Sequence, residues 1–205
     1  VREQIRSIYG YDPGSFEHIP FADQAFRFNA RLDYNISRNH RAMVRFNMFD
    51  AFEDVTINGN SIRGLPATHR YNNTNRFGPE AITFSNAHYS ADSRVTSLVA
   101  ELNSTFGANI ANNFRIGNTW AIPSERGYSG GDFPMIEVME PEGATPNVYY
   151  MSLGNELFTV GNLLENNTFS VSNTLTYSAG QHTITGGANF EYMTFYNAFN
   201  PVWNS

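Results

Sequence analysis

The feature that most constrains this chain is an alternation of apolar and polar residues that continues for ten residues or more. It is clearest between residues 26 and 36, where the even positions are Phe26, Phe28, Ala30, Leu32, Tyr34 and Ile36. The odd positions between them are Arg27, Asn29, Arg31, Asp33 and Asn35. Successive side chains of a β-strand point to opposite faces, so this segment is predicted to be a strand with one apolar and one polar face.

The same alternation returns five more times, and the six segments pair into three hairpins. The further segments lie at about 41–52, 94–106, 112–122, 169–177 and 184–192. Each pair is connected by a short polar turn, near Arg38, Asn109 and Gly180. Two long stretches without a clear period separate the pairs, at about 53–92 and 123–166. Short turns at one end and long loops at the other are typical of outer-membrane β-barrels.

The distribution of charge indicates which face would meet lipid. Along the central part of all six segments, the apolar face carries no Asp, Glu, Lys or Arg. A charge at the middle of a lipid-facing surface costs about 2–4 kcal/mol, so its absence is expected there. The polar face is predicted to line the lumen, and its charged residues are Arg27, Arg31, Asp33, Arg45, Glu101, Arg115 and Glu191. The predicted fold is therefore all-β, an antiparallel transmembrane β-barrel.

A soluble β-sandwich is the main alternative fold, because its strands also alternate and its apolar faces form the core. The predicted strands of about 10–12 residues are twice as long as the 5–6 residues typical of soluble sheets. The chain is also rich in aromatic residues, at 15%, and poor in charged ones, at 16%. This composition suits long strands with one wet and one apolar face, so the barrel is favoured.

Six strands are too few for a transporter-sized barrel, and an open sheet would leave two unpaired edges in lipid. We therefore expect the chain to be part of a larger barrel. If the short turns face the periplasm, residues 1–25 are the end of an extracellular loop. Residues 26–205 are then a partial barrel with extracellular loops at about 53–92 and 123–166. No signal peptide begins the chain, so a missing N-terminal part is also expected.

The composition excludes several other classes of protein. The chain has no cysteine, so neither a disulfide framework nor a thiolate metal site is expected. A net charge of -6 without any run rich in Lys or Arg argues against a nucleic-acid partner. No stretch approaches 18 consecutive apolar residues, so no transmembrane helix is expected.

No group of residues points to catalysis, a cofactor or a resident metal. The GxSxG pattern at 127–131 lies in a Gly-rich segment, so we interpret it as a loop and expect no enzyme activity. The five histidines lack the spacing of metal ligands. An acidic group of Asp132, Glu137, Glu140 and Glu142 offers oxygens that suit Ca²⁺. It lacks the order of an EF-hand, and a solvated loop is the favoured interpretation.

Aromatic residues in the second long stretch are the candidate ligand contacts. Tyr128, Phe133, Tyr149 and Tyr150 could form a stacking platform for a sugar or a peptide. They could instead pack the loops against one another, and this second interpretation is favoured.

Several segments carry a resemblance to a known family. They read FNARLDYNIS at 28–37, NHR at 39–41, VRFN at 44–47, VAELNS at 99–104, GQHTITGG at 180–187 and NFE at 189–191. In order and spacing these segments resemble the barrel hairpins of TonB-dependent receptors from Bacteroidetes-type bacteria. The closest similarity is to the Oar-like subgroup, and it extends over roughly residues 5–200.

The resemblance implies a barrel of about 22 strands with a plugged lumen in the outer membrane of a Gram-negative bacterium. It implies the passage of a large or scarce substrate, with energy delivered by a TonB-type protein. The partners expected on this basis are outer-membrane lipid, the TonB-type protein, an unidentified substrate and a surface lipoprotein.

Two other functions remain open at this stage. One is a surface adhesin or outer-membrane assembly component anchored by a barrel. The other is a soluble carbohydrate-binding module. A plug and a TonB-contacting segment upstream would mark the receptor, whereas solubility without detergent would mark the module.

Overall fold

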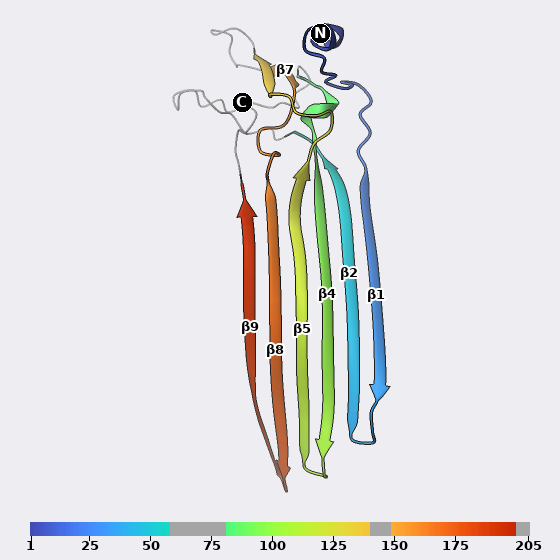
Figure 1. Ribbon diagram of the computed structural model, residues 1–205, viewed down its shortest axis with the longest axis vertical. Coiled ribbons are helices and arrows are strands. Elements are labelled where there is room, and N and C mark those ends of the chain that lie inside the picture. The colour runs from blue at the N-terminus through green and yellow to red at the C-terminus, as the bar shows by residue number, and fades with distance from the viewer. Residues whose placement is uncertain (58–80, 140–148, 200–205) are drawn as a thin grey trace, which may run out of the picture.

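The computed structural model describes residues 1–57, 81–139 and 149–199. Six long strands form one antiparallel sheet in the order β1-β2-β4-β5-β8-β9 (Figure 1). Their bounds are β1 Asp23–Asn35, β2 His40–Val55, β4 Tyr89–Phe106, β5 Ile110–Gly127, β8 Leu163–Ala179 and β9 His182–Ala198. Each strand pairs with the long strand that follows it along the chain, so the sheet is a meander of three hairpins. The predicted all-β, antiparallel fold with six strands is confirmed.

The strands continue further towards the loop end than the sequence pattern predicted. β2 extends to Val55, and β4 already begins at Tyr89. The predicted loop at 53–92 was therefore too long, and the one at 123–166 was too long for the same reason. The alternation fades at this end because polar and apolar side chains are mixed on both faces. The backbone ladder continues nevertheless, since its hydrogen bonds do not depend on side-chain polarity.

Glycines allow two of the predicted turns to be short. Gly180 and Gln181 alone connect β8 to β9, and Gly180 has a φ of 61°. Gly107 begins the turn between β4 and β5 with a φ of 62°. A residue without a Cβ adopts this left-handed conformation at little steric cost, which lets the strands reverse within two or three residues.

The three turns do not lie level across the sheet, as their stepped ends in Figure 1 show. One continuous row of paired residues runs through Asn35, Arg41, Asn103, Asn113, Thr174 and Gly187. The β1–β2 ladder ends at this row, the β4–β5 ladder continues three residues further to Phe106, and the β8–β9 ladder continues five to Ala179. With the turns at one membrane surface, this stagger corresponds to a strand tilt of about 40°, as in closed barrels.

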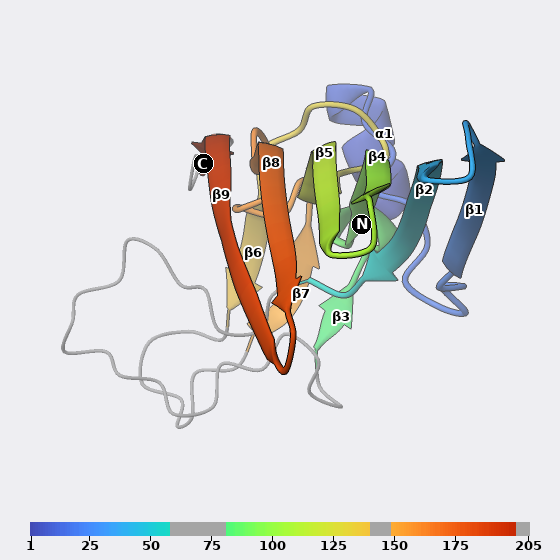
Figure 2. The same ribbon diagram turned by 90° about the horizontal axis from the view of Figure 1, so that it is seen from below.

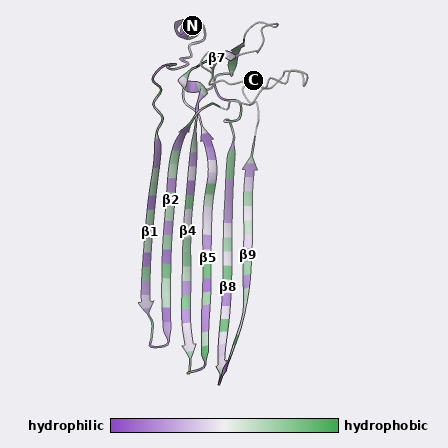
Figure 3. Cartoon of the chain, turned by 180° about the vertical axis from the view of Figure 1, so that it is seen from behind, coloured by the Kyte–Doolittle hydropathy of each residue, from purple (hydrophilic) through white to green (hydrophobic). Residues whose placement is uncertain are grey.

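The pairing places alternate residues of all six strands on two different faces, which we call the apolar face and the polar face. A central row of the apolar face contains Leu32, Val44, Ala100, Ile116, Val171 and Phe190. The neighbouring row of the polar face contains Arg31, Arg45, Val99, Gly117, Ser170 and Glu191. Figure 3 shows the resulting bands of opposite hydropathy along the strands.

No second layer covers the apolar face in the part of the chain that the structure describes. Seen along the strands, the sheet is a single twisted layer (Figure 2). Leu32 is 70% exposed and Phe190 is 60% exposed. A β-sandwich would bury such residues against a second sheet, so the sandwich alternative is wrong for this chain. An uncovered apolar face of this extent is suited to hydrocarbon rather than water.

The segments between the hairpins and the N-terminal residues form a small cap at the loop end of the sheet (Figure 1). Its elements are α1 Arg2–Tyr9, β3 Ile82–Thr83, η1 Ser85–Ala87, β6 Ile136–Met139 and β7 Tyr149–Leu153. β7 pairs with β3 in parallel and with β6 in antiparallel fashion. Phe84, Met151 and Leu153 form its buried core, against which Phe133 also packs.

The N-terminal segment, predicted to be a loop end at 1–25, contains the helix α1, and β1 already begins at Asp23. Gly10 ends the helix in the left-handed conformation. Arg2 then donates through Nε to Asp12 Oδ1 at 2.8 Å, which fastens the helix to the segment that follows. This hydrogen bond holds the pKa of Asp12 well below its usual range. Among the described residues, no helix is both long and apolar enough to cross a membrane.

Candidate functional site

The polar face carries all seven charged residues that were predicted to share it. Arg27, Arg31 and Asp33 lie on β1, Arg45 on β2, Glu101 on β4, Arg115 on β5 and Glu191 on β9. The strand register places every one of them on the same side of the sheet. Their position at the lumen itself stays a prediction.

Two ion-pair groups extend across the polar face. Asp33 accepts hydrogen bonds from Arg31 Nε at 2.7 Å and from Arg41 at 2.9 Å. Glu101 accepts from Arg115 at 2.8 Å across the β4–β5 pair. Asp33 and Glu101 therefore each lie next to at least one guanidinium, an arrangement that needs a hydrated surface because the guanidinium groups remain half exposed.

Arginine is in excess on the β1–β2 part of the polar face. Arg31 and Arg45 are directly opposite each other across the two strands, although both are cations. The guanidinium of Arg27 lies 5.1 Å from the centre of the Phe49 ring. Between the Arg27–Phe49 pair and the turn, four arginines on this face, the fourth being Arg41, thus accompany the single carboxylate of Asp33. The carboxylates of Asp23 and Glu53 lie on the same face nearer the loop end.

The polar residues that interrupt the apolar face have partners on the same face. Asn118 donates to Asn167 at 2.6 Å, and Asn112 donates to Asn173 at 2.7 Å. Near the loop end, Arg94 donates to Asp50 at 2.8 Å across the β2–β4 pair. Pairing removes much of the cost of placing amides and charges against lipid.

A buried carboxylate connects the cap to the loop end of the sheet. Glu156 accepts hydrogen bonds from the Phe158 amide and the Thr159 hydroxyl, both at 2.9 Å. Arg126 lies 4.0 Å from the same oxygen, and its guanidinium is 4.6 Å from the centre of the Tyr89 ring. Arg126 therefore bridges strands β4 and β5 to the segment that follows β7. The sequence gives no periodic signal for this contact, so it was not predicted.

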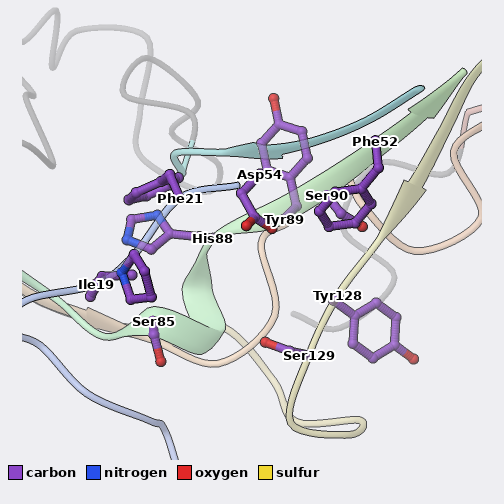
Figure 4. A pocket seen from close by; sticks show the side chains of 11 residues that line it. Ile19, Phe21, Phe52, Asp54, Ser85, His88, Tyr89, Ser90, Tyr128 and Ser129 are labelled. Carbon is purple, nitrogen blue, oxygen red and sulfur yellow. The ribbon is translucent and has the colours of Figure 1, made fainter. Parts of the chain in front are cut away.

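A cavity, which we call the rim pocket, lies where this cap meets the ends of β2 and β4 (Figure 4). Its volume is about 410 Å³. Its lining residues are Ile19, Pro20, Phe21, Phe52, Asp54, Ser85, His88, Tyr89, Ser90, Tyr128 and Ser129. A cavity of this size with aromatic walls and a few polar groups has the usual features of a small-ligand site.

His88 organises one wall of the rim pocket. Its Nδ1 accepts the backbone N–H of Ile57 at 3.0 Å, which leaves the proton of the neutral ring on Nε2. Burial lowers the pKa of His88 below its ordinary value of 6.5, and the carboxylate of Asp54 opposes this shift. Phe21 meets the imidazole edge-on, with the ring centres 5.1 Å apart. His88 is therefore a structural acceptor in its neutral form.

The predicted aromatic contacts do not form one platform. Tyr128 lines the rim pocket and donates its hydroxyl to Asp132, which raises the pKa of Tyr128. Phe133 instead stacks on Tyr11 with ring centres 4.0 Å apart, so it packs one part of the cap against another. Tyr150 lies on β7 and is 52% exposed. The side chain of Tyr149 lies outside the described residues.

The remaining motif predictions concern loops. Gly127 ends β5, residues 129–131 form a bend, and the next element is the strand β6, so the GxSxG pattern is not a nucleophile elbow. Of the acidic group, Asp132 and Glu137 are described, whereas Glu140 and Glu142 lie outside the described residues. Within residues 1–57, 81–139 and 149–199, no three His, Asp or Glu side chains are placed to hold a metal ion.

Long staggered strands with one uncovered apolar face and one charged face define the class of membrane-spanning β-barrel proteins. The family model described as "Outer membrane beta barrel domain" matches residues 15–203 of this chain. The chain belongs to this family, and its location is the outer membrane of a Gram-negative bacterium. Comparisons with curated proteins and with solved structures gave no match. Membership in the TonB-dependent, Oar-like subgroup stays a prediction.

Proposed function

We propose that this chain forms part of the barrel of a TonB-dependent outer-membrane transporter that moves a large or scarce substrate. The short turns face the periplasm, the cap faces the cell exterior, and the polar face lines the interior. The proposed activity is passage without covalent chemistry or a resident cofactor.

The observation that carries this proposal is the set of charged and amide side chains that the polar face carries on several of its strands. Ion pairs and amide hydrogen bonds connect Glu101 to Arg115, and Asn103 to Asn113, across the β4–β5 pair. A barrel used only as an anchor needs an apolar exterior but no charged interior. An interior rich in half-exposed guanidinium groups instead suits a water-filled passage or contact with a polar occupant.

The orientation can be tested with single cysteines, because the chain has no cysteine of its own. Glu17→Cys lies in the exposed segment before β1, and Arg38→Cys lies in the exposed turn between β1 and β2. In intact cells, a membrane-impermeant maleimide is expected to label Glu17→Cys only. Labelling of Arg38→Cys alone would show that the proposed orientation is inverted.

Transport itself is tested by comparing the compounds that remain in the growth medium. A strain lacking this protein and a strain lacking its TonB-type protein are expected to leave the same compounds unconsumed. If the strain lacking the TonB-type protein still consumes the compounds that the strain lacking this protein leaves in the medium, the proposal of energised transport is wrong. Loss of surface attachment in the first strain alone would then favour the adhesin alternative.

A further inference from the structure

The rim pocket opens on the side of the sheet that continues the apolar face. β2 and β4 pair without a register shift from His40 to Val55. Phe52 and Asp54 therefore point to the same side as Val44, which lies in the central row of the apolar face. The pocket lies outside the interior that the proposed transport function uses.

The height of the pocket above the hydrocarbon follows from strand geometry. A strand tilted by about 40° climbs about 2.5 Å per residue, so about ten residues cross the roughly 25 Å apolar band of an outer-membrane barrel. Counted from His40 at the turn, the band ends near Asp50, where the Asp50–Arg94 ion pair lies. Phe52 and Asp54 come immediately beyond it. The pocket is therefore level with the polar headgroups of the membrane.

The chemistry of the lining suits an uncharged ligand with many hydroxyl groups. Phe52 and Tyr128 offer aromatic rings, and Ser90 and Ser129 offer hydroxyls. Asp54 accepts the backbone N–H of Ala22 through Oδ2 at 2.8 Å, and a carboxylate has further lone pairs for hydroxyl donors. The described lining contains neither Lys nor Arg, so nothing in it neutralises a phosphate or a carboxylate.

We propose that the rim pocket binds an uncharged sugar in the headgroup of an outer-leaflet glycolipid. The C–H face of the sugar stacks on an aromatic ring, and its hydroxyls donate to Asp54. A lipid-borne sugar fits better than a free one, because the pocket opens on the lipid-facing side at headgroup height. The assignment to the outer leaflet rests on the orientation proposed above.

Binding is measured with the intact protein purified from outer membranes and placed in nanodiscs. One probe is lipopolysaccharide of the host bacterium. The other is the oligosaccharide that mild acid releases from it, with its phosphate groups removed in a separate step. Calorimetric titration is expected to show binding of both probes, and Phe52→Ala and Asp54→Asn are each expected to weaken it at least ten-fold. Phe46→Ala, on the same strand and face but within the apolar band, is the matched control and is expected to bind as the wild type does.

Folding of each variant is checked by its shift in gel mobility on boiling, which marks an intact barrel. Binding that Phe52→Ala and Asp54→Asn leave unchanged would overturn the assignment to this pocket. Binding of the oligosaccharide but not of lipopolysaccharide would overturn the glycolipid and leave a free saccharide as the ligand. If the probes bind but the maleimide does not label Glu17→Cys in intact cells, the pocket is not at the outer leaflet. That result would identify the proposed orientation as the part that failed.

Discussion

At the scale of single residues, the cap depends on glycines that allow very close backbone contact. Gly154 follows β7 with a φ of 89°, and a Cβ at this position would overlap the carbonyl of Pro134. This contact brings the start of β6 and the end of β7 together, and it holds Asn155 in its buried position.

Gly154→Ala is expected to destabilise the cap by about 1–3 kcal/mol, because it adds both backbone strain and a clash with backbone atoms. Amide hydrogen exchange of β6 and β7 should quicken while the long strands stay protected. Gly131→Ala is the matched control, since Gly131 has a φ of 81° but open space around its Cβ position. Equal effects of the two variants would show that the contact with Pro134 is unimportant.

The burial of His88 predicts that the stability of the rim pocket depends on pH. Its folded pKa is lowered below 6.5 by burial, so the unfolded chain takes up the proton more readily. The stability contributed by neutral His88 is therefore present above about pH 6.5 and is lost as the pH falls below it. Protonation also removes the acceptor for the Ile57 N–H.

Hydrogen exchange at Ile57, corrected for the intrinsic effect of pH, should therefore become faster below pH 6.5. Asp54 and Phe21 face the same imidazole, and the negative charge of Asp54 moderates the change. In His88→Gln, whose amide oxygen can accept a hydrogen bond at any pH, the acid-dependent step should disappear. A step that persists in His88→Gln would assign the titration to another group.

At the scale of strands and hairpins, amide pairs on the two faces should differ in strength. Asn118 and Asn167 pair on the apolar face, whereas Asn103 and Asn113 pair on the polar face. Water competes for the second pair much more than for the first.

A double-mutant cycle with leucine at positions 118 and 167 is expected to give a coupling energy of about 0.6–1.7 kcal/mol. The same cycle at Asn103 and Asn113 should give less than about 0.5 kcal/mol, because exposed polar groups exchange partners with water. Unfolding by urea in lipid vesicles provides the free energies. Equal coupling in both cycles would contradict the assignment of the apolar face to lipid.

The sequence was sufficient to predict the hairpins and faces because alternation and turn composition are local signals. Arg31 and Glu191 were placed on one face by counting residues, and the register agrees. The strand ends beyond Phe52 were missed, since the regular alternation of polar and apolar residues is lost there while the backbone ladder continues. The rim pocket could not be predicted, because it joins Phe21, Phe52 and Tyr128 from three distant segments without any shared period.

At the scale of the whole molecule, the assignment of the apolar face to lipid makes one strong prediction. Val171 and Ser172 are adjacent on β8 and point to opposite faces. Val171→Arg places a charge in the central row of the apolar face and should cost about 2–4 kcal/mol of folding free energy.

Ser172→Arg adds the same charge to the same strand on the polar face and should cost less than about 1 kcal/mol, since surface substitutions usually have small effects. Urea unfolding in vesicles and the gel shift on boiling report both variants. A larger loss for Ser172→Arg than for Val171→Arg would show that the two faces have been assigned the wrong way round.

The two outermost strands, β1 and β9, limit how such a sheet can insert into the membrane. Each is hydrogen-bonded along one side, and the backbone groups of the other side have no strand partner among the described residues. Every unpaired backbone N–H or C=O group in hydrocarbon costs several kcal/mol, so a sheet with unpaired edges is not stable in the bilayer. Insertion and completion of strand pairing must therefore proceed as one event. Until that event, the unpaired backbone groups of β1 and β9 can pair with the strands of other chains, which promotes aggregation.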